Sequence, residues 1–131
     1  MSTKPNASGS SKQYPVRWGF VGTGSIATSM ARAISTTPAA KLSAVASRNI
    51  TKAQSFGTEH GVTRAFDSWA EMLAWEDIDA VYVATPTSLR EEISIAAAAA
   101  GKHVLAEKPF ASLPSLERIT AACRENRVSF M

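Results

Sequence analysis

Residues 16–27, which read VRWGFVGTGSIA, are the feature that most constrains how this chain can fold. A short apolar run passes directly into a Gly-Thr-Gly turn at residues 22–24, and apolar residues then recur at helical spacing. This pattern predicts a strand, a tight turn and a helix. Gly22 permits the turn, Gly24 lets a pyrophosphate approach the backbone, and Ala27 allows close packing of helix on strand. Small residues also serve ordinary strand-to-helix turns, so the flanking pattern has to decide.

The rest of the chain alternates strand-like and helix-like segments. We expect strands at residues 16–21, 41–47, 62–66, 80–84, 102–107 and 127–131, with helices between them at about 26–34, 51–61, from 68, 88–101 and 114–126. Capping-box spacing, from Ser68 to Glu71 and from Ser88 to Glu91, marks two of the helix starts. Such alternation predicts an α/β fold, a doubly wound Rossmann sheet of about six parallel strands in the order 3-2-1-4-5-6.

Length and composition favour one globular domain. The chain has 131 residues, of which we assign 15–131 to the domain and 1–14, rich in Ser, Lys, Asn and Gly, to a disordered leader. No apolar run approaches the roughly 20 residues that cross a bilayer, so we expect a soluble, cytoplasmic protein with no membrane partner. The single cysteine, Cys123, falls on an apolar helical stripe and is expected to be buried. No metal site is predicted.

Charge is distributed unevenly along the sequence. Residues 1–58 contain seven Lys and Arg and no acid, whereas all eleven acids lie from Glu59 onward. The basic half contains the glycine turn. Its cations are single and scattered rather than clustered with aromatic residues, which argues against nucleic acid and fits a small phosphorylated ligand better.

The carboxyl end of the second expected strand reads Ala46-Ser47-Arg48-Asn49, without an acid. In Rossmann folds an acid here binds the adenosine ribose of NAD, while an Arg accommodates a 2′-phosphate. The Arg48 guanidinium can pair bidentately with a phosphate, and Ser47 can add a hydroxyl hydrogen bond. A solvated loop arginine is the alternative. The missing acid also disfavours S-adenosylmethionine-dependent methyl transfer, a third reading of the fold.

Two further strand ends bring polar groups to the same edge of the expected sheet. Thr85-Pro86 ends the fourth strand, where proline cannot continue the ladder. Glu107-Lys108-Pro109 ends the fifth and places a cation beside a carboxylate. Lys108 could hydrogen-bond a ribose or a substrate hydroxyl; a surface lysine in a turn is the alternative.

The segments GTGSIA, ASR, AVYVATPTSL and AEKP occur in this order and spacing. From about Tyr14 to Met131 the chain therefore resembles the amino-terminal NAD(P)-binding domain of the Gfo/Idh/MocA oxidoreductase family, and its opening is most similar to NADP-dependent dihydrodiol and xylose dehydrogenases. The resemblance implies hydride transfer between NADP, or NAD, and a hydroxyl-bearing carbon of a sugar, cyclitol or diol.

The resemblance also assigns roles to residues. Lys108 maps onto the family's EKP lysine, which is taken to contact substrate and nicotinamide ribose, and is the candidate catalytic residue. Together with the turn and strand-end readings, the expected cofactor-binding set is Gly22, Thr23, Gly24, Ser25, Ile26, Ser47, Arg48, Thr85, Pro86, Glu107 and Lys108. Arg90 departs from the family pattern, since many members carry His there, and its role is left open.

Length is the larger departure, because family members continue into a second domain that supplies most substrate contacts. We expect the dinucleotide-binding domain alone, which binds a nicotinamide dinucleotide and meets a small polyol or sugar only if a second domain is supplied. The leading alternative is a non-catalytic nucleotide-binding module or partner subunit. Self-association into a homo-oligomer is left open.

Overall fold

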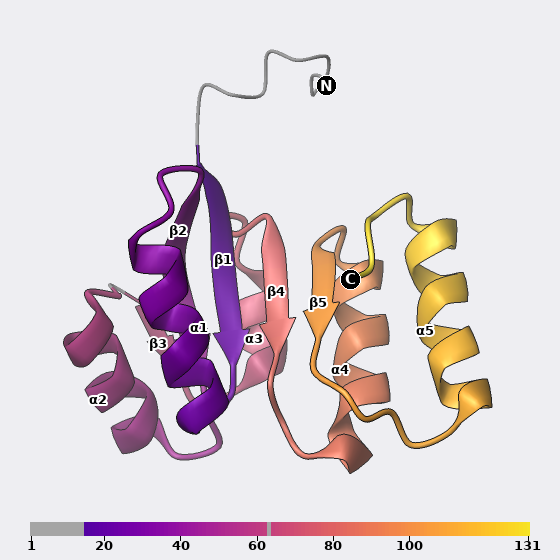
Figure 1. Cartoon of the computed structure of the whole chain (residues 1–131), viewed down its shortest axis with the longest axis horizontal. Coiled ribbons are helices and arrows are strands. Elements are labelled where there is room, and N and C mark those ends of the chain that lie inside the picture. Colours follow the sequence, from indigo (N-terminus) through magenta and orange to yellow (C-terminus); the bar gives the residue numbers. More distant parts are fainter. Residues whose placement is uncertain (1–14, 63) are drawn as a thin grey trace.

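The strands form one parallel sheet whose order reverses at its centre. The computed structural model describes residues 15–62 and 64–131; the expected leader, residues 1–14, lies outside them. Five strands pair in the order β3-β2-β1-β4-β5 (Figure 1). Their bounds are β1 Val16–Val21, β2 Ala40–Ala46, β3 Arg64–Phe66, β4 Ala80–Val83 and β5 His103–Ala106. The predicted Rossmann order is confirmed for these five strands.

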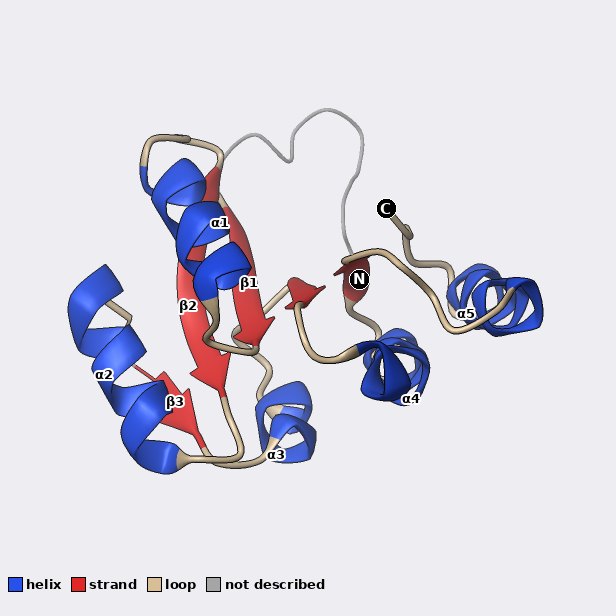
Figure 2. Cartoon of the chain, turned by 60° about the horizontal axis from the view of Figure 1, so that its bottom comes forward, coloured by secondary structure: helices blue, strands red, loops and turns tan. Residues whose placement is uncertain are grey.

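Helices cover both faces of the sheet because every crossover between parallel strands passes over one face or the other. Figure 2 shows α1 on one face and α3 and α4 on the other. The helices are α1 Ser25–Ser35, α2 Ile50–His60, α3 Trp69–Ala74, α4 Thr87–Ala99 and α5 Leu113–Glu125. One apolar core joins the sheet to α1 and α2 around Phe20 and Tyr82, and the other joins it to α3, α4 and α5 around Val81 and Ile93.

An irregularity in β2 changes which side chains face each core. Its register against β1 slips after Trp18, which pairs with Leu42, while Gly19 pairs with Ala44. Strict alternation would place Leu42 and Ala44 on one face. Instead Leu42 packs in the α1–α2 core and Ala44 in the opposite one. The strand was predicted correctly, but the alternation of its apolar residues did not predict which side chains face which core.

The expected sixth strand, residues 127–131, is not a strand in the described part of the chain. Arg127 takes a left-handed conformation with φ 59°, and the Val128 amide donates to the Cys123 carbonyl at 3.0 Å, so both residues belong to the turn that ends α5. The remaining residues lie parallel to β5, with one bridge between Phe130 and Val104. The Val104 amide donates to the Ser129 carbonyl at 2.9 Å, the Met131 amide to the Val104 carbonyl at 2.8 Å, and the Ala106 amide to the Met131 carbonyl at 3.1 Å. The strand was predicted to begin at residue 127 because the apolar pattern does not show how many residues the turn after a helix contains.

The two predicted capping boxes have different outcomes. Ser68 does cap α3, its hydroxyl oxygen accepting from the Glu71 amide at 3.3 Å. The prediction that Ser88 caps a helix was wrong: α4 begins at Thr87, its cap position is Pro86, two residues before Ser88, and no side chain caps it. Pro86 has φ −55° and ψ 150°, an extended conformation of the kind that cap residues adopt, so the helix begins with the residue after it.

Polar ties hold the amino ends of the central strands, opposite the carboxyl ends that carry the predicted site. Arg17 of β1 donates to both carboxylate oxygens of Asp79, which precedes β4, at 3.1 and 2.9 Å. The buried Lys102 ammonium donates to the carbonyls of Trp75 and Ile78. Cys123 is buried as predicted, and burial raises the pKa of its thiol. No helix within the described ranges is long and apolar enough to cross a membrane.

Candidate functional site

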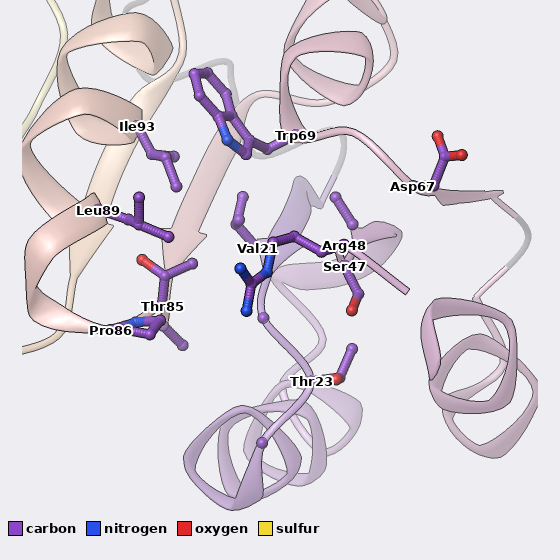
Figure 3. Close-up of a pocket in the computed structure, with 14 residues that line it drawn as sticks. Val21, Thr23, Ser47, Arg48, Asp67, Trp69, Thr85, Pro86, Leu89 and Ile93 are labelled. Carbon is purple, nitrogen blue, oxygen red and sulfur yellow. The ribbon is translucent and has the colours of Figure 1, made fainter. Parts of the chain in front are cut away.

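A pocket of about 430 Å³ opens at the carboxyl ends of the strands, beside the boundary between β1 and β4 (Figure 3). The chain leaves β1 toward β2 and β3 on one side and returns to β4 on the other, so this boundary is the switch point at which doubly wound sheets bind ligands. The pocket is lined by Val21, Gly22, Thr23, Gly24, Ala46, Ser47, Arg48, Asp67, Trp69, Ala84, Thr85, Pro86, Leu89 and Ile93.

The two glycines of the turn meet different constraints. Gly22 has φ 114°, and a Cβ built there would lie 2.8 Å from the carbonyl oxygen of Ala84. The fold itself therefore requires glycine at this position. Gly24 has an ordinary φ of −77°, and a Cβ there would meet no atom within 4 Å. The space in front of Gly24 is open to a ligand that approaches the backbone.

Two of the helices that begin beside the pocket, α1 and α4, start without a side-chain cap. Gly24 caps α1 without a side-chain hydrogen bond, and Pro86 does the same at α4. In contrast Asn49, Ser68 and Ser112 each accept a backbone amide at the starts of α2, α3 and α5. No acid occupies the first turn of α1. Its first amides and the positive end of its dipole are therefore available to an anion.

The loop after β2 supplies a cation at the pocket. Figure 3 shows the Arg48 side chain directed into it, and the structure records no hydrogen bond or ion pair for this side chain within the described ranges. Ser47 also lines the pocket, its hydroxyl oxygen accepting from the Asn49 amide at 3.3 Å. Lys52, in the first turn of α2, lines a neighbouring open groove that shares Thr23 and Gly24 with the pocket. Glu59 lines the same groove, so the cation at the end of β2 that faces the pocket is Arg48.

Thr85 and Pro86 form the wall contributed by β4 and α4. The Thr85 hydroxyl oxygen is buried and has no hydrogen-bond partner among the described residues. A buried hydroxyl without a partner is unfavourable unless a ligand or water satisfies it.

Glu107 and Lys108 follow β5 and are not part of the pocket lining. The Glu107 carboxylate accepts a hydrogen bond of 2.5 Å from the buried Tyr82 hydroxyl. Lys108 is exposed, and the peptide bond from it to Pro109 is cis. Arg90 donates from Nε to the Thr85 carbonyl at 2.8 Å and from a terminal nitrogen to the Pro109 carbonyl at 2.5 Å.

Seven of the eleven predicted cofactor residues line the pocket: Gly22, Thr23, Gly24, Ser47, Arg48, Thr85 and Pro86. Ser25 and Ile26 instead form the start of α1, with the Ile26 side chain largely exposed. Glu107 and Lys108 lie one strand further along the same edge. Their contacts with a cofactor stay predictions.

The other seven residues of the lining were not predicted as site residues: Val21, Ala46, Asp67, Trp69, Ala84, Leu89 and Ile93. Trp69 and Leu89 pack against the core as expected and also face the pocket. Asp67 and Trp69 follow the carboxyl end of β3, the one strand end that was not considered. Figure 3 shows the Asp67 carboxylate turned away from Arg48. Counting every strand end would have found both residues.

The residues present fit a dinucleotide. An uncapped helix start faces open space above Gly24, a cation is directed into the pocket, and Trp69, Leu89 and Ile93 give it an apolar wall. Apolar walls with a few placed polar groups are typical of cofactor sites. Over residues 15–62 and 64–131, no group of three or more His, Cys, Asp or Glu is placed to hold a metal ion.

Comparison with known proteins agrees with this geometry. The profile of the Gfo/Idh/MocA oxidoreductase family, described by its NAD-binding Rossmann fold, matches residues 16–131. The chain is 35% identical over 117 residues to scyllo-inositol 2-dehydrogenase (NADP(+)) of Bacillus subtilis, covering 88% of this chain and 36% of that enzyme. It is 33% identical over 118 residues to trans-1,2-dihydrobenzene-1,2-diol dehydrogenase of Xenopus laevis, covering 88% and 36%.

Solved structures are similar over the same range. A 3-ketoreductase of Actinomadura kijaniata in complex with NADP superposes with a TM-score of 0.85 at 36% identity, covering 89% of this chain and 38% of that one. Apo scyllo-inositol dehydrogenase of Lactobacillus casei gives 0.83 at 28%, covering 92% and 36%. The chain thus spans about a third of the length of these relatives. With its profile match, its strand order and its switch-point pocket, it belongs to the Gfo/Idh/MocA oxidoreductase family and contains that family's NAD-binding Rossmann domain.

Proposed function

We propose that this chain binds NADP in preference to NAD, as the dinucleotide-binding part of an oxidoreductase that acts on a hydroxyl-bearing carbon of a sugar, cyclitol or diol. The single observation that carries the cofactor preference is Arg48, a cation without a partner among the described residues, directed into a pocket whose β2 end has no acid. A carboxylate there would repel a 2′-phosphate, whereas a guanidinium can bind it bidentately.

In this proposal, different residues of the site contact different parts of the dinucleotide. The α1 start and Gly24 receive the pyrophosphate, Ser47 and Arg48 receive the 2′-phosphate, and Thr85 lies toward the nicotinamide half. NADP supplies the hydride chemistry. Lys108 follows the next strand, where its ammonium can donate to the nicotinamide ribose or to a substrate hydroxyl. The NADP complex of the Actinomadura kijaniata 3-ketoreductase, which shares the fold at 36% identity, supports the choice of cofactor.

The substrate belongs to the same proposal. Relatives named for scyllo-inositol and for a dihydrodiol suggest a small polyol or sugar. The matched segment is about a third of each relative, so we expect further protein to be needed to hold that substrate, either on the same polypeptide or in a partner copy. A purely nucleotide-binding module would bind NADP equally well and never transfer hydride.

The test is isothermal titration of residues 1–131 with NADP and NAD, for the parent and for Arg48→Glu. NADP should bind the parent more tightly. Replacing Arg48 should weaken NADP binding by about ten- to a hundredfold, roughly 1.5 to 3 kcal/mol for a charge-assisted contact, and leave NAD binding nearly unchanged. Equal affinities in the parent, or an unchanged preference in the variant, would contradict the proposal.

Arg32→Glu is the matched control. Arg32 lies in the last turn of α1, away from the pocket, and is exposed. This variant changes the net charge by the same amount, so it reports the general electrostatic effect on an anionic ligand. Only a loss of NADP affinity larger than that of the Arg32→Glu variant is attributed to the contact of Arg48 with the phosphate.

A further inference from the structure

The short loop that carries Lys108 is attached to the rest of the domain on both sides of the lysine. Before it, the Glu107 amide donates to the Val83 carbonyl at 3.0 Å, and the Glu107 carboxylate accepts from the Tyr82 hydroxyl at 2.5 Å. After it, the Pro109 carbonyl accepts from Arg90 at 2.5 Å. The lysine itself is exposed between these anchors.

Arg90 joins two loops with one guanidinium. It stands in the first turn of α4, and while one nitrogen holds the Pro109 carbonyl its Nε holds the Thr85 carbonyl at 2.8 Å. The loop after β4 and the loop after β5 are thereby tied to each other at the mouth of the sheet. The guanidinium donates from two separate nitrogens held at fixed positions in a rigid fork, whereas a lysine ammonium, such as that of Lys102, donates to its two carbonyls from a single atom.

Tyr82 provides the second anchor from inside the fold. Its ring is fully buried in the α1–α2 core, in contact with the ring of Phe20. Burial raises the pKa of its phenol well above the ordinary 10, and the hydrogen bond to Glu107 and that carboxylate's charge raise it further, while Arg90 opposes them. The phenol therefore keeps its proton at neutral pH and is the donor of this hydrogen bond.

The distance of this loop from Arg48 shows which part of a bound dinucleotide the loop can contact. Arg48 follows β2, and β5 lies three strand spacings away along the same edge, about 14 Å. An extended dinucleotide with its 2′-phosphate at Arg48 has its nicotinamide half at the ends of β4 and β5. The two loops carry Thr85, which lines the pocket, and Lys108, which is exposed beside it in the chain order of the strands.

We propose that Arg90 is a positioning residue that, together with Tyr82, holds the Lys108 loop against the Thr85 loop and so sets where the Lys108 ammonium lies beside the nicotinamide half of bound NADP. The inference rests on the proposed function and extends it to residues that do not touch the pocket. It also accounts for arginine at this position: the side chain binds two backbone carbonyls of its own chain rather than a ligand phosphate.

The experiment compares two ligands in residues 1–131. NADP reaches the tied loops, whereas adenosine 2′,5′-bisphosphate, which lacks the nicotinamide half, does not. Arg90→Lys keeps the charge and loses the fork. It should weaken NADP binding by about tenfold, the scale of reordering one or two side chains on binding, and leave the bisphosphate affinity within about twofold. Tyr82→Phe, which removes only the hydroxyl, should show the same division between the ligands.

A double-mutant cycle separates positioning from a general loss of structure. If Arg90 acts through the lysine, Arg90→Lys should cost almost nothing further in NADP affinity once Lys108 is alanine. Arg118→Lys is the matched control. Arg118 pairs with Glu91 between α5 and α4, so the substitution disturbs an arginine contact of α4 without touching either loop.

A measurement without ligand tests the anchors alone. Exchange of the Glu107 amide hydrogen with solvent should be faster in Arg90→Lys than in the parent and in Arg118→Lys. Full binding by Arg90→Lys, parallel losses for both ligands, an additive cycle, or unchanged Glu107 exchange would each overturn the proposal. A parent that bound neither ligand would overturn the proposed function, and the exchange measurement would still report on the anchors.

Discussion

At the scale of single residues, the two glycines of the turn serve different needs although one motif contains both. Gly22 is required by the backbone, because its φ is 114° and a Cβ would meet the Ala84 carbonyl oxygen at 2.8 Å. Gly24 meets no such obstacle in the chain itself. A side chain at Gly24 would occupy only the space that a pyrophosphate needs. The requirement for glycine there comes from the ligand, and that at Gly22 from the fold.

Substitution separates these two requirements. Gly24→Val should keep the circular dichroism spectrum and the denaturation midpoint close to those of the parent while lowering NADP affinity at least about a hundredfold, since the pyrophosphate can no longer reach the α1 amides. Gly22→Val is the reference for a structural glycine and should unfold at clearly lower denaturant. If Gly24→Val bound NADP as the parent does, the turn would be structural only and the site proposal would fail.

At the scale of elements, the helix starts at the carboxyl edge of the sheet differ in how they are capped. The capping side chains Asn49, Ser68 and Ser112 stabilise α2, α3 and α5, each typically by about 1 kcal/mol. The starts of α1 and α4, which border the pocket, lack such caps. At the opposite edge the central strands are tied by the Arg17–Asp79 contacts. At the carboxyl edge, where the pocket opens, the starts of α1 and α4 therefore leave their first amides without a side-chain partner, whereas α2, α3 and α5 begin at the same edge with caps.

The ion pair between Arg17 and Asp79 predicts that the free energy of unfolding decreases at acidic pH. Burial tends to raise the pKa of Asp79, but hydrogen bonds and the charge of Arg17 outweigh it and hold that pKa below 3.8. A lowered folded pKa stabilises the fold above the unfolded value, and the contribution is lost as pH falls through the folded one. The urea midpoint of the parent should therefore fall more steeply than that of Asp79→Asn between about pH 5 and pH 2.

The control for this prediction is Glu117→Gln, on the exposed surface of α5. It removes a carboxylate that makes no side-chain ion pair recorded within the described ranges, so its urea midpoints should follow those of the parent at every pH. Parallel pH curves for the parent and Asp79→Asn would show that the tie contributes nothing through its charge.

At the scale of the whole molecule, strand order brings distant segments to one edge. The residues that line the pocket extend from Val21 to Ile93, and Lys108 follows the next strand. The two histidines lie elsewhere: His103 begins β5 at the opposite edge, and His60 ends α2. Within the described ranges, no histidine is therefore placed beside Lys108 to accept a proton from a substrate hydroxyl.

This arrangement predicts binding without efficient turnover for residues 1–131 alone. Hydride transfer from a hydroxyl-bearing carbon needs a proton acceptor and a wall that fixes the carbon against the nicotinamide, and one exposed lysine supplies neither wall nor second group. NADP reduction over a panel of aldoses, cyclitols and diols should stay near background although titration shows binding. Robust turnover that disappears in Lys108→Ala would show instead that this domain is a complete enzyme.

Local patterns in the sequence determined most of the architecture. Apolar spacing predicted the five strands and the helices between them, and the Gly-Thr-Gly turn together with the strand-end segments indicated the edge and the family. These features can be read locally because each reflects hydrogen bonding and burial within a few residues. Errors arose where a local rule had competitors, as at Ser88, where Pro86 takes the cap position instead, and at Arg127, where the end of α5 uses residues expected in a strand.

Only the tertiary structure decided which side chains meet. The register slip in β2 places Leu42 and Ala44 in different cores. Trp69 contacts the core and also lines the pocket. Arg90 donates hydrogen bonds to the carbonyls of two loops. These pairings join residues from separate strands and helices. Their partners are set by strand order and register, which depend on packing of the whole sheet against its helices and have no signature in the spacing of neighbouring residues.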